Sequence, residues 1–352
     1  MYNRKEGLIG METTYWKVNQ ENSAAIQEAA SRIKSGDIVA FPTETVYGLG
    51  ADATNAEAVA KIFIAKGRPQ DNPLIAHVAN KEQLYRLVQQ IPGYVEPLLH
   101  AFTPGPLTFV LPSNGVCAPN VTAGLSTIAV RIPDHPIALA LIEAANKPLA
   151  APSANLSGKP SPTTAGHVAE DLNGKIAGIL DGGPTGVGVE STVLDCTKET
   201  PVILRPGGIT SEQIAAVLEM DIMAPVKKLD PEQQPKSPGM KYKHYSPEVP
   251  LWLVEGKTED IQALIDEEKQ KGKKVGLLAS NSTAMQLQAD EINMLGENME
   301  AIAANLYHGL RHFKEGKVDL LICEAFPEEG IGLAIMNRLK KAASSFLHLS
   351  SS

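Results

Sequence analysis

The local fold of this chain is decided by the segment Ala56-Glu-Ala-Val-Ala-Lys-Ile-Phe-Ile-Ala-Lys66-Gly67-Arg68-Pro69-Gln-Asp-Asn72-Pro73-Leu-Ile-Ala-His77-Val78. Proline fixes its own φ and disfavours a helical conformation in the residue before it. We therefore expect a helix that begins near Ala56 and ends near Gly67, then a stiff polar loop, then a short buried strand over 74–78. The loop and strand bring together two cations, an amide and an imidazole, which favours the binding of an anion.

The composition is that of an ordinary globular protein. The chain has 352 residues, of which 43% are hydrophobic and 20% are charged, and its formal net charge is −8. This length predicts roughly two domains, and this hydrophobic fraction excludes a disordered chain. The negative charge argues against a broad nucleic-acid surface but permits a local cationic pocket.

Cysteine, histidine and apolar patterns exclude several other classes. Cys117, Cys196 and Cys323 are far apart and form no CxxC motif, so we expect free thiols rather than disulfides or a zinc site. His308 and His312 lack the glutamate of an HExxH motif, so we expect no metal site. No apolar run reaches the ~18 residues of a membrane span, and no secretory signal opens the sequence. We therefore expect a cytoplasmic protein without a membrane anchor.

Predicted helices and strands alternate on both sides of the opening segment. We expect further helices over 21–35 and 137–146 and strands over 37–41, 107–111, 127–132, 148–152, 191–195 and 202–205. Because their order lacks βαβ regularity, residues 15–223 are predicted to form a twisted, mixed α/β sheet.

The composition changes after residue 223. Residues 224–249 are rich in proline and lysine, which predicts a semi-extended linker. Beyond it, strands over 251–254, 274–279 and 318–323 alternate with helices over 258–271, 299–315 and 331–343. This regular alternation predicts a smaller, Rossmann-like α/β domain over residues 250–346.

Polar loops follow several of the predicted strands, where open α/β sheets bind ligands. They cover residues 43–48, 151–163 and 181–192, the last being rich in glycine but neither a Walker A nor a dinucleotide-binding loop. Each loop alone is also compatible with a plain connection. Ser153 and Ser191 lie in no nucleophile elbow. Together, cationic and hydroxyl-rich loops without a nucleophile favour adenylyl or phosphoryl transfer, which depends on positioning and charge neutralisation.

The same motifs, in the same order, resemble a known family. PTETVYGLG, KIFIAKGRPQDNPL, APSANLSGKPSPT, GVESTVLD and LRPGGI occur as in the YrdC-like threonylcarbamoyl-AMP synthases, and SPGMKYKHYSP with a further C-terminal domain resembles the long two-domain form. The resemblance implies a YrdC-like fold for the first domain. It also implies that L-threonine, bicarbonate and ATP are converted to threonylcarbamoyl-AMP and pyrophosphate by a nucleotidyltransferase. The product would pass to a complex that modifies tRNA, and we expect direct tRNA binding to be weak or absent. Mg²⁺ would arrive with ATP, without a dedicated metal site.

The resemblance assigns roles to particular residues. It implies catalytic roles for Lys66 and Arg68, and a lid formed by Tyr242 or Tyr245 of the linker. The expected ATP contacts are Lys66, Arg68, Asn72, Thr127, Ser153, Asn155, Ser161, Arg205, Tyr242 and Tyr245. The expected threonine contacts are Thr45, His77, Arg131, Ala151 and Ser191.

Two other functions remain open from the sequence. A concave cationic surface could bind structured RNA, although the net charge argues against it. A carbamoyl-handling domain of the hydrogenase-maturation type is the other alternative. The chain lacks the cysteine-rich and acylphosphatase-like segments of such proteins.

Overall fold

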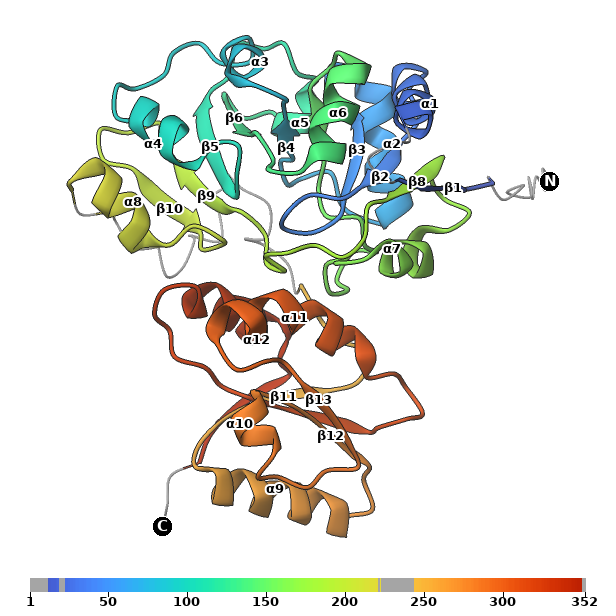
Figure 1. Ribbon diagram of the computed structural model, residues 1–352, viewed down its shortest axis with the longest axis vertical. Coiled ribbons are helices and arrows are strands. Elements are labelled where there is room, and N and C mark those ends of the chain that lie inside the picture. Colours follow the sequence, from blue (N-terminus) through green and yellow to red (C-terminus); the bar gives the residue numbers. More distant parts are fainter. Residues whose placement is uncertain (1–11, 19–22, 221, 223–243, 350–352) are drawn as a thin grey trace, which may run out of the picture.

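Two β-sheets, one in each half of the chain, organise this computed structural model (Figure 1). The structure describes residues 12–18, 23–220, 222 and 244–349. We call the part before residue 223 the first domain and residues 251–349 the second domain. The predicted linker is described only from His244 onward, so Tyr242 lies outside the described residues.

The first sheet is mixed, as predicted. It has ten strands in the order β1-β8-β2-β3-β7-β4-β6-β5-β9-β10; β4 pairs with β6 in parallel, whereas β5 pairs with β6 antiparallel. The strands are β1 (Thr14–Lys17), β2 (Val39–Phe41), β3 (Gly48–Asp52), β4 (Ile75–His77), β5 (Leu107–Pro112), β6 (Thr127–Arg131), β7 (Leu149–Ala150), β8 (Gly178–Asp181), β9 (Thr192–Asp195) and β10 (Val202–Arg205).

Helices cover both faces of this sheet. They are α1 (Ser23–Lys34), α2 (Ala56–Lys66), α3 (Lys81–Tyr85), α4 (Val95–Phe102), α5 (Pro119–Thr122), α6 (Pro136–Ala145), α7 (Ala165–Leu172) and α8 (Ser211–Leu218). Apolar side chains of α1 and α6 form one core with β2, and those of α2, α4, α7 and α8 form a second core. Burial on both faces explains why central strands such as β2 and β5 are almost wholly apolar.

Helix α2 ends where the sequence predicts. Asn55 caps its start by accepting hydrogen bonds from the backbone N–H groups of Glu57 and Ala58. Gly67 ends it with φ 61°, a left-handed conformation that glycine adopts without steric cost. The turn at Gly67 ends the helix and thereby sets the position of the next residue, Arg68.

Strand β3 was not expected from the sequence. Its residues, Gly48-Leu-Gly-Ala-Asp52, include two glycines, which weaken a strand pattern. The glycines are explained by packing, because a Cβ atom built on Gly50 would lie 2.8 Å from the Phe41 ring on β2. Strands β1 and β8 were missed as well.

The second sheet is entirely parallel, in the order β13-β12-β14-β11-β15. Its elements are β11 (Leu251–Glu255), α9 (Thr258–Gln270), β12 (Val275–Ala279), α10 (Asn281–Ala284), β13 (Glu291–Met294), α11 (Met299–His312), β14 (Leu320–Glu324), α12 (Gly332–Ala342) and β15 (Ser345–His348). The predicted Rossmann-like alternation is confirmed, although α10, β13 and β15 were not foreseen.

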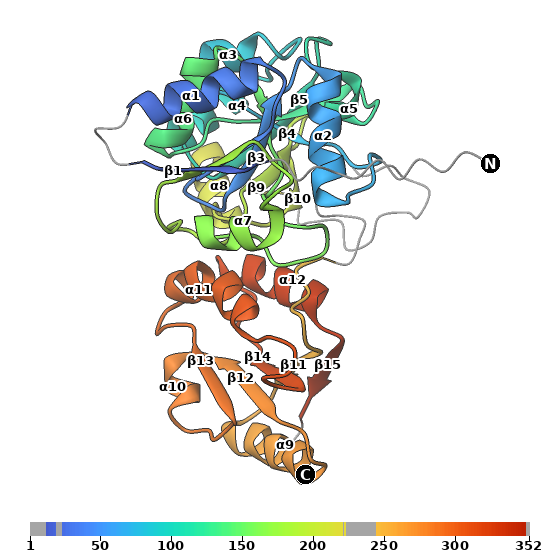
Figure 2. The same cartoon turned by 90° about the vertical axis from the view of Figure 1, so that its right-hand side faces the viewer.

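Helices α11 and α12 lie between the second sheet and the first domain (Figures 1 and 2). Helices α9 and α10 pack on the opposite face of the second sheet. The core around α11 and α12 also takes in Val46 and Val189 of the first domain and Tyr245 of the linker. The two domains therefore share a continuous apolar contact beside the linker.

Candidate active site

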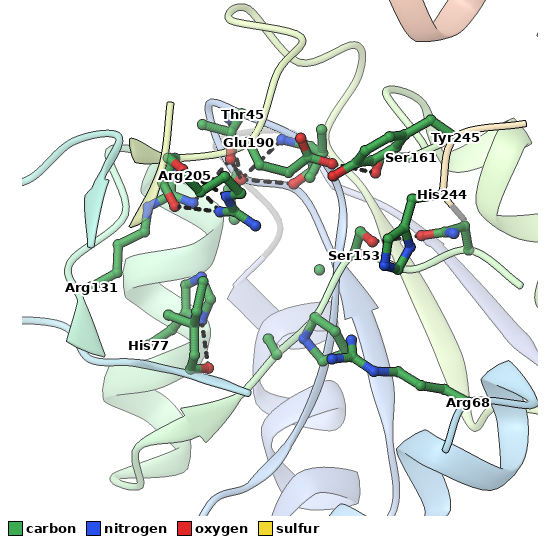
Figure 3. Close-up of a pocket in the computed structure, with 18 of the residues that line it drawn as sticks. Thr45, Arg68, His77, Arg131, Ser153, Ser161, Glu190, Arg205, His244 and Tyr245 are labelled. Carbon is green, nitrogen blue, oxygen red and sulfur yellow. Dashed lines mark hydrogen bonds between the residues drawn. The ribbon is translucent and has the colours of Figure 1, made fainter. Parts of the chain in front are cut away.

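A cavity that is partly open to solvent lies where loops of the first sheet meet the end of the linker. Figure 3 shows Arg68 and His244 pointing into it from one side, and Arg131 and His77 from the other. Of the residues predicted from the sequence, it is lined by Thr45, Arg68, His77, Arg131, Ala151, Ser153, Asn155, Ser161, Ser191, Arg205 and Tyr245.

Arg131, at the end of β6, is held rigidly at one side of this cavity. Its Nη1 donates to Thr45 Oγ1 at 3.0 Å and its Nε to the Gly105 carbonyl at 3.2 Å. Its Nη2 lies 2.6 Å from Glu44 Oε1. A buried guanidinium fixed on several sides offers a preorganised partner for a carboxylate.

His77 lies beside Arg131 and is a neutral group. Burial, reinforced by the positive charge of Arg131, lowers the pKa of His77 to about 3. The ring lies edge-on to Phe41, with Nδ1 3.3 Å from the Ile75 carbonyl. It can therefore exchange hydrogen bonds with a substrate without adding charge to the site.

The loop after β7 is fixed by its own side chains and by Lys66 beneath it. Ser153 Oγ donates to Asn155 Oδ1 at 2.5 Å, and Asn155 Nδ2 donates to the carbonyls of Leu156 and Lys159. Lys66 Nζ donates to the carbonyls of Ser153 and Asn155 at 2.5 and 2.6 Å. Because Lys66 is 3% exposed and makes these bonds, it holds the loop and does not itself line the cavity.

Arg205 and Ser191 form a second buried polar unit. Arg205 donates from Nε and Nη2 to the Ser191 carbonyl, at 3.2 and 2.9 Å, and from Nη2 to Ser191 Oγ at 3.2 Å. Ser191 Oγ also lies 2.7 Å from Thr108 Oγ1. Strands β5, β9 and β10 thus position one cation and one hydroxyl group at the same wall.

Two other predicted residues do not reach the cavity. Asn72 is fully buried, and its side-chain amide has no hydrogen-bond partner among the described residues. Thr127 begins β6, whereas Arg131 ends it, so the two lie at opposite ends of a strand about 13 Å long. Contacts of Lys66, Asn72 and Thr127 with ATP therefore stay predictions, as does any contact of Tyr242.

The cavity also contains residues that the sequence interpretation left without a role. They are Thr43, Val46, Gly48, Ile75, Pro152, Lys159, Glu190 and His244. Several of them lie directly beside predicted residues: Glu190 precedes Ser191, and His244 precedes Tyr245. These residues could have been predicted from their position next to assigned residues in the same motif.

Neither a metal cluster nor a membrane-spanning helix is found among the described residues. No group of three or more histidine, cysteine or acidic side chains is arranged there to hold a metal ion. No helix in that part of the chain has the length and apolar character to cross a membrane.

Comparison with known proteins connects this geometry to a family. Residues 31–207 match the Sua5/YciO/YrdC family model, described as telomere recombination. Residues 209–344 match the model of the threonylcarbamoyl-AMP synthase C-terminal domain. The threonylcarbamoyl-AMP synthase of Bacillus subtilis is 53% identical over 341 residues, covering 95% of this chain and 98% of the relative. The synthase of Pyrococcus abyssi is 51% identical, covering 90% and 94%.

A solved structure agrees with these matches along the chain. The crystal structure of Pyrococcus abyssi Sua5 complexed with L-threonine superposes with a TM-score of 0.88 at 48% identity. The superposition covers 97% of this chain and 99% of that one. Both domains and their order are therefore shared, and the chain belongs to the threonylcarbamoyl-AMP synthase family.

Proposed function

We propose that this enzyme converts L-threonine, bicarbonate and ATP to threonylcarbamoyl-AMP and pyrophosphate. The observation that carries the proposal is that one cavity has Arg131 and His77 on one side and Arg68 on the other. Such a cavity can align an amino acid with a triphosphate. A relative that is similar along nearly its whole length has been solved with L-threonine.

The Arg131 side of the cavity suits L-threonine. Arg131 and Thr45 offer charged and neutral hydrogen-bond partners for its carboxylate and hydroxyl groups, and Ser191 adds a further hydroxyl. Neutral His77 can accept a hydrogen bond from the substrate, because its pKa of about 3 keeps it unprotonated near neutral pH. The small side chain of Ala151 leaves room for a substrate to approach the backbone.

The Arg68 side suits the phosphates of ATP. Arg68 Nη2 lies 3.5 and 3.4 Å from the carbonyl oxygens of Asn72 and Pro73, which are long contacts compared with charge-assisted hydrogen bonds to phosphate. Arg205 and Lys159 line the same cavity, as do the hydroxyl groups of Ser153 and Ser161. The Mg²⁺ ion would enter as part of the MgATP substrate.

For this reaction the protein must align the substrates with one another, and no covalent bond to a protein side chain is needed. The threonine amine attacks the bicarbonate carbon with loss of water, and the resulting carbamate oxygen attacks the α-phosphorus of ATP. The bond from that phosphorus to the bridging oxygen breaks, and pyrophosphate leaves. Because AMP is transferred from ATP to the carbamate, the enzyme would be a nucleotidyltransferase, and its arginine side chains would neutralise the developing charge.

The end of the linker can protect the product. His244 and Tyr245 line the cavity opposite Arg131, where they would exclude water from a mixed anhydride that hydrolyses readily. A complex that acts on tRNA would then accept the threonylcarbamoyl group.

The test is pyrophosphate release by the full-length chain. We expect release only when L-threonine, bicarbonate and MgATP are all present, with threonylcarbamoyl-AMP as the second product by mass spectrometry. Omitting each substrate in turn provides the controls. Release that does not depend on threonine, or no release with all three substrates, would disprove the proposal.

A further inference from the structure

Side chains of the second domain support one wall of the cavity from behind. Glu190, in the loop before β9, lines the cavity and is 7% exposed. Its carboxylate hydrogen-bonds to Ser161 of the first domain and to Tyr307 on α11 and Arg338 on α12. Tyr307 and Arg338 are fully buried.

Both oxygens of Glu190 are used. Oε1 accepts from Ser161 Oγ at 2.6 Å and from the Tyr307 hydroxyl at 3.0 Å. Oε2 accepts from the same Tyr307 hydroxyl at 2.8 Å and from Arg338 Nε at 3.0 Å. Arg338 Nη1 also donates to the Pro206 carbonyl at 2.5 Å, next to Arg205. Two helices of the second domain therefore fix a carboxylate, a serine and the chain beside Arg205.

Tyr307 also supports the end of the linker. Its ring stacks on that of Tyr245, with ring centroids 5.4 Å apart and an interplanar angle of 26°. Arg338 lies 5.9 Å from the centroid of the same Tyr245 ring. One pair of side chains thus contacts both the cavity wall and the residue expected to cover the cavity.

The charges explain why this arrangement matters for a nucleotide. An uncompensated carboxylate in a buried wall would repel phosphate and would attract Arg205 away from it. Arg338 pairs with that charge at 3.0 Å, so Arg68 and Arg205 leave the cavity with a net positive character. The pKa of Glu190 lies at about 2, despite the opposing effect of burial, because Arg338 and Arg205 stabilise the carboxylate.

We propose that Arg338 and Tyr307 are positioning residues for the nucleotide: together they neutralise and orient Glu190, so that Ser161 stays bonded to Glu190 in the wall and Arg205 faces the phosphates of ATP. This inference rests on the proposed function, because it takes ATP as the ligand. It gives the second domain a defined task in the reaction, performed through a carboxylate of the first domain.

Substrate binding to full-length variants tests the proposal. Arg338→Met should raise the Kd of a nonhydrolysable MgATP analogue at least about tenfold, because it leaves Glu190 charged and unpaired, and should change the Kd of L-threonine less than about twofold. Adding Glu190→Gln to Arg338→Met removes the unpaired charge and should restore most of the analogue affinity. Tyr307→Phe keeps the stacked ring and should weaken analogue binding by about threefold or more.

Lys314→Met is the matched control, because Lys314 on the chain after α11 pairs across the domains with Glu170 outside the cavity. It should leave both Kd values within about twofold of the wild type, a change too small to count as a lost hydrogen bond. Melting temperatures establish that each variant is folded, and Tyr307→Phe alone decides the test if Arg338→Met does not fold.

Equal losses of both ligands, no loss of the analogue, or no recovery in the double variant would overturn the proposal. A wild-type chain that binds neither ligand would instead overturn the proposed function and this inference with it. A wild-type chain that binds both, with variants that do not discriminate, would overturn this inference alone.

Discussion

The two sheets of this molecule use polar residues in opposite ways. In the first domain, Arg68, Arg131 and Arg205 line a cavity at the ends of strands and loops. In the second domain, the carboxyl ends of β12 and β14, where parallel sheets usually bind ligands, are closed by internal hydrogen bonds. Glu324 there accepts from the backbone N–H and hydroxyl of Ser280 and from the hydroxyl of Thr283.

The polar groups at these strand ends of the second domain thus bond to one another, whereas those of the first domain line a cavity. The second domain instead faces the first domain with α11 and α12 (Figure 2). Its buried arginines, Arg311 and Arg338, are directed at the first domain rather than at its own sheet.

The largest effect should follow from removing the cation of the first domain that faces the expected triphosphate. Arg68→Ala should lower the rate of pyrophosphate release at least about 100-fold, because charge stabilisation of the leaving group is lost. The melting temperature should stay close to that of the wild type. Lys61→Ala, which removes an exposed cation of α2 that pairs with Asp37, is the control and should retain activity. A fall in melting temperature typical of a core mutation would give Arg68 a structural role instead.

A smaller and more selective effect is expected on the other side of the cavity. Arg131→Lys keeps the charge but loses the planar fork that contacts Thr45, Glu44 and Gly105. The Kd of L-threonine should rise about tenfold, whereas that of the MgATP analogue should barely change. Calorimetry on the same preparation measures both constants. Similar losses for both substrates would mean that the cavity does not separate them.

Burial of ionisable groups should make the first domain sensitive to acid. An ordinary histidine has a pKa of 6.5, and that of His77 is about 3 in the fold, so the unfolded chain takes up a proton first as the pH falls. The free energy of unfolding is therefore fully present above about pH 6.5 and decreases toward pH 3. His77→Gln should reduce this slope by about 1.4 kcal/mol per pH unit below pH 6. Parallel denaturation midpoints of the two proteins from pH 7 to pH 4.5 would contradict the assignment.

The smallest effect on activity should come from the strand ends of the second domain. Glu324→Gln replaces one acceptor with a donor among groups that donate to it, which should lower the free energy of unfolding by about 1–2 kcal/mol. Pyrophosphate release should stay within about twofold of the wild type, a change of under 1 kcal/mol in the barrier. A large loss of activity in a folded Glu324→Gln protein would show that these strand ends take part in the reaction.

Local chemistry made part of this molecule predictable from the sequence. The prolines and Gly67 determine where α2 ends, and apolar runs bounded by proline mark β4, β5 and β6. The hydroxyl-rich loops after strands pointed to Thr45 and Ser153, which line the cavity, and their contacts with substrates stay predictions.

Features that depend on distant parts of the chain were not predictable. Tyr307 and Arg338 reach Glu190 across 117 and 148 residues, and nothing near them in the sequence indicates such a contact. Lys66 and Arg68 look equivalent in sequence, but only the fold distinguishes the buried cation from the one in the cavity. The glycines of β3 made this strand hard to predict, because they are required by close packing against the Phe41 ring on the neighbouring strand.

The left-handed turn at Gly67 has a consequence for the length of the chain. Lys66 lies on the buried side of α2 with Ile62 and Phe63, and the turn then directs Arg68 into the cavity. One residue inserted in α2 would rotate Lys66 by about 100° around the helix axis, away from the Ser153 loop. The length of this helix is therefore constrained as strongly as the identity of the two cations. Relatives that keep both cations should show no insertions or deletions between the Asn55 cap and Gly67.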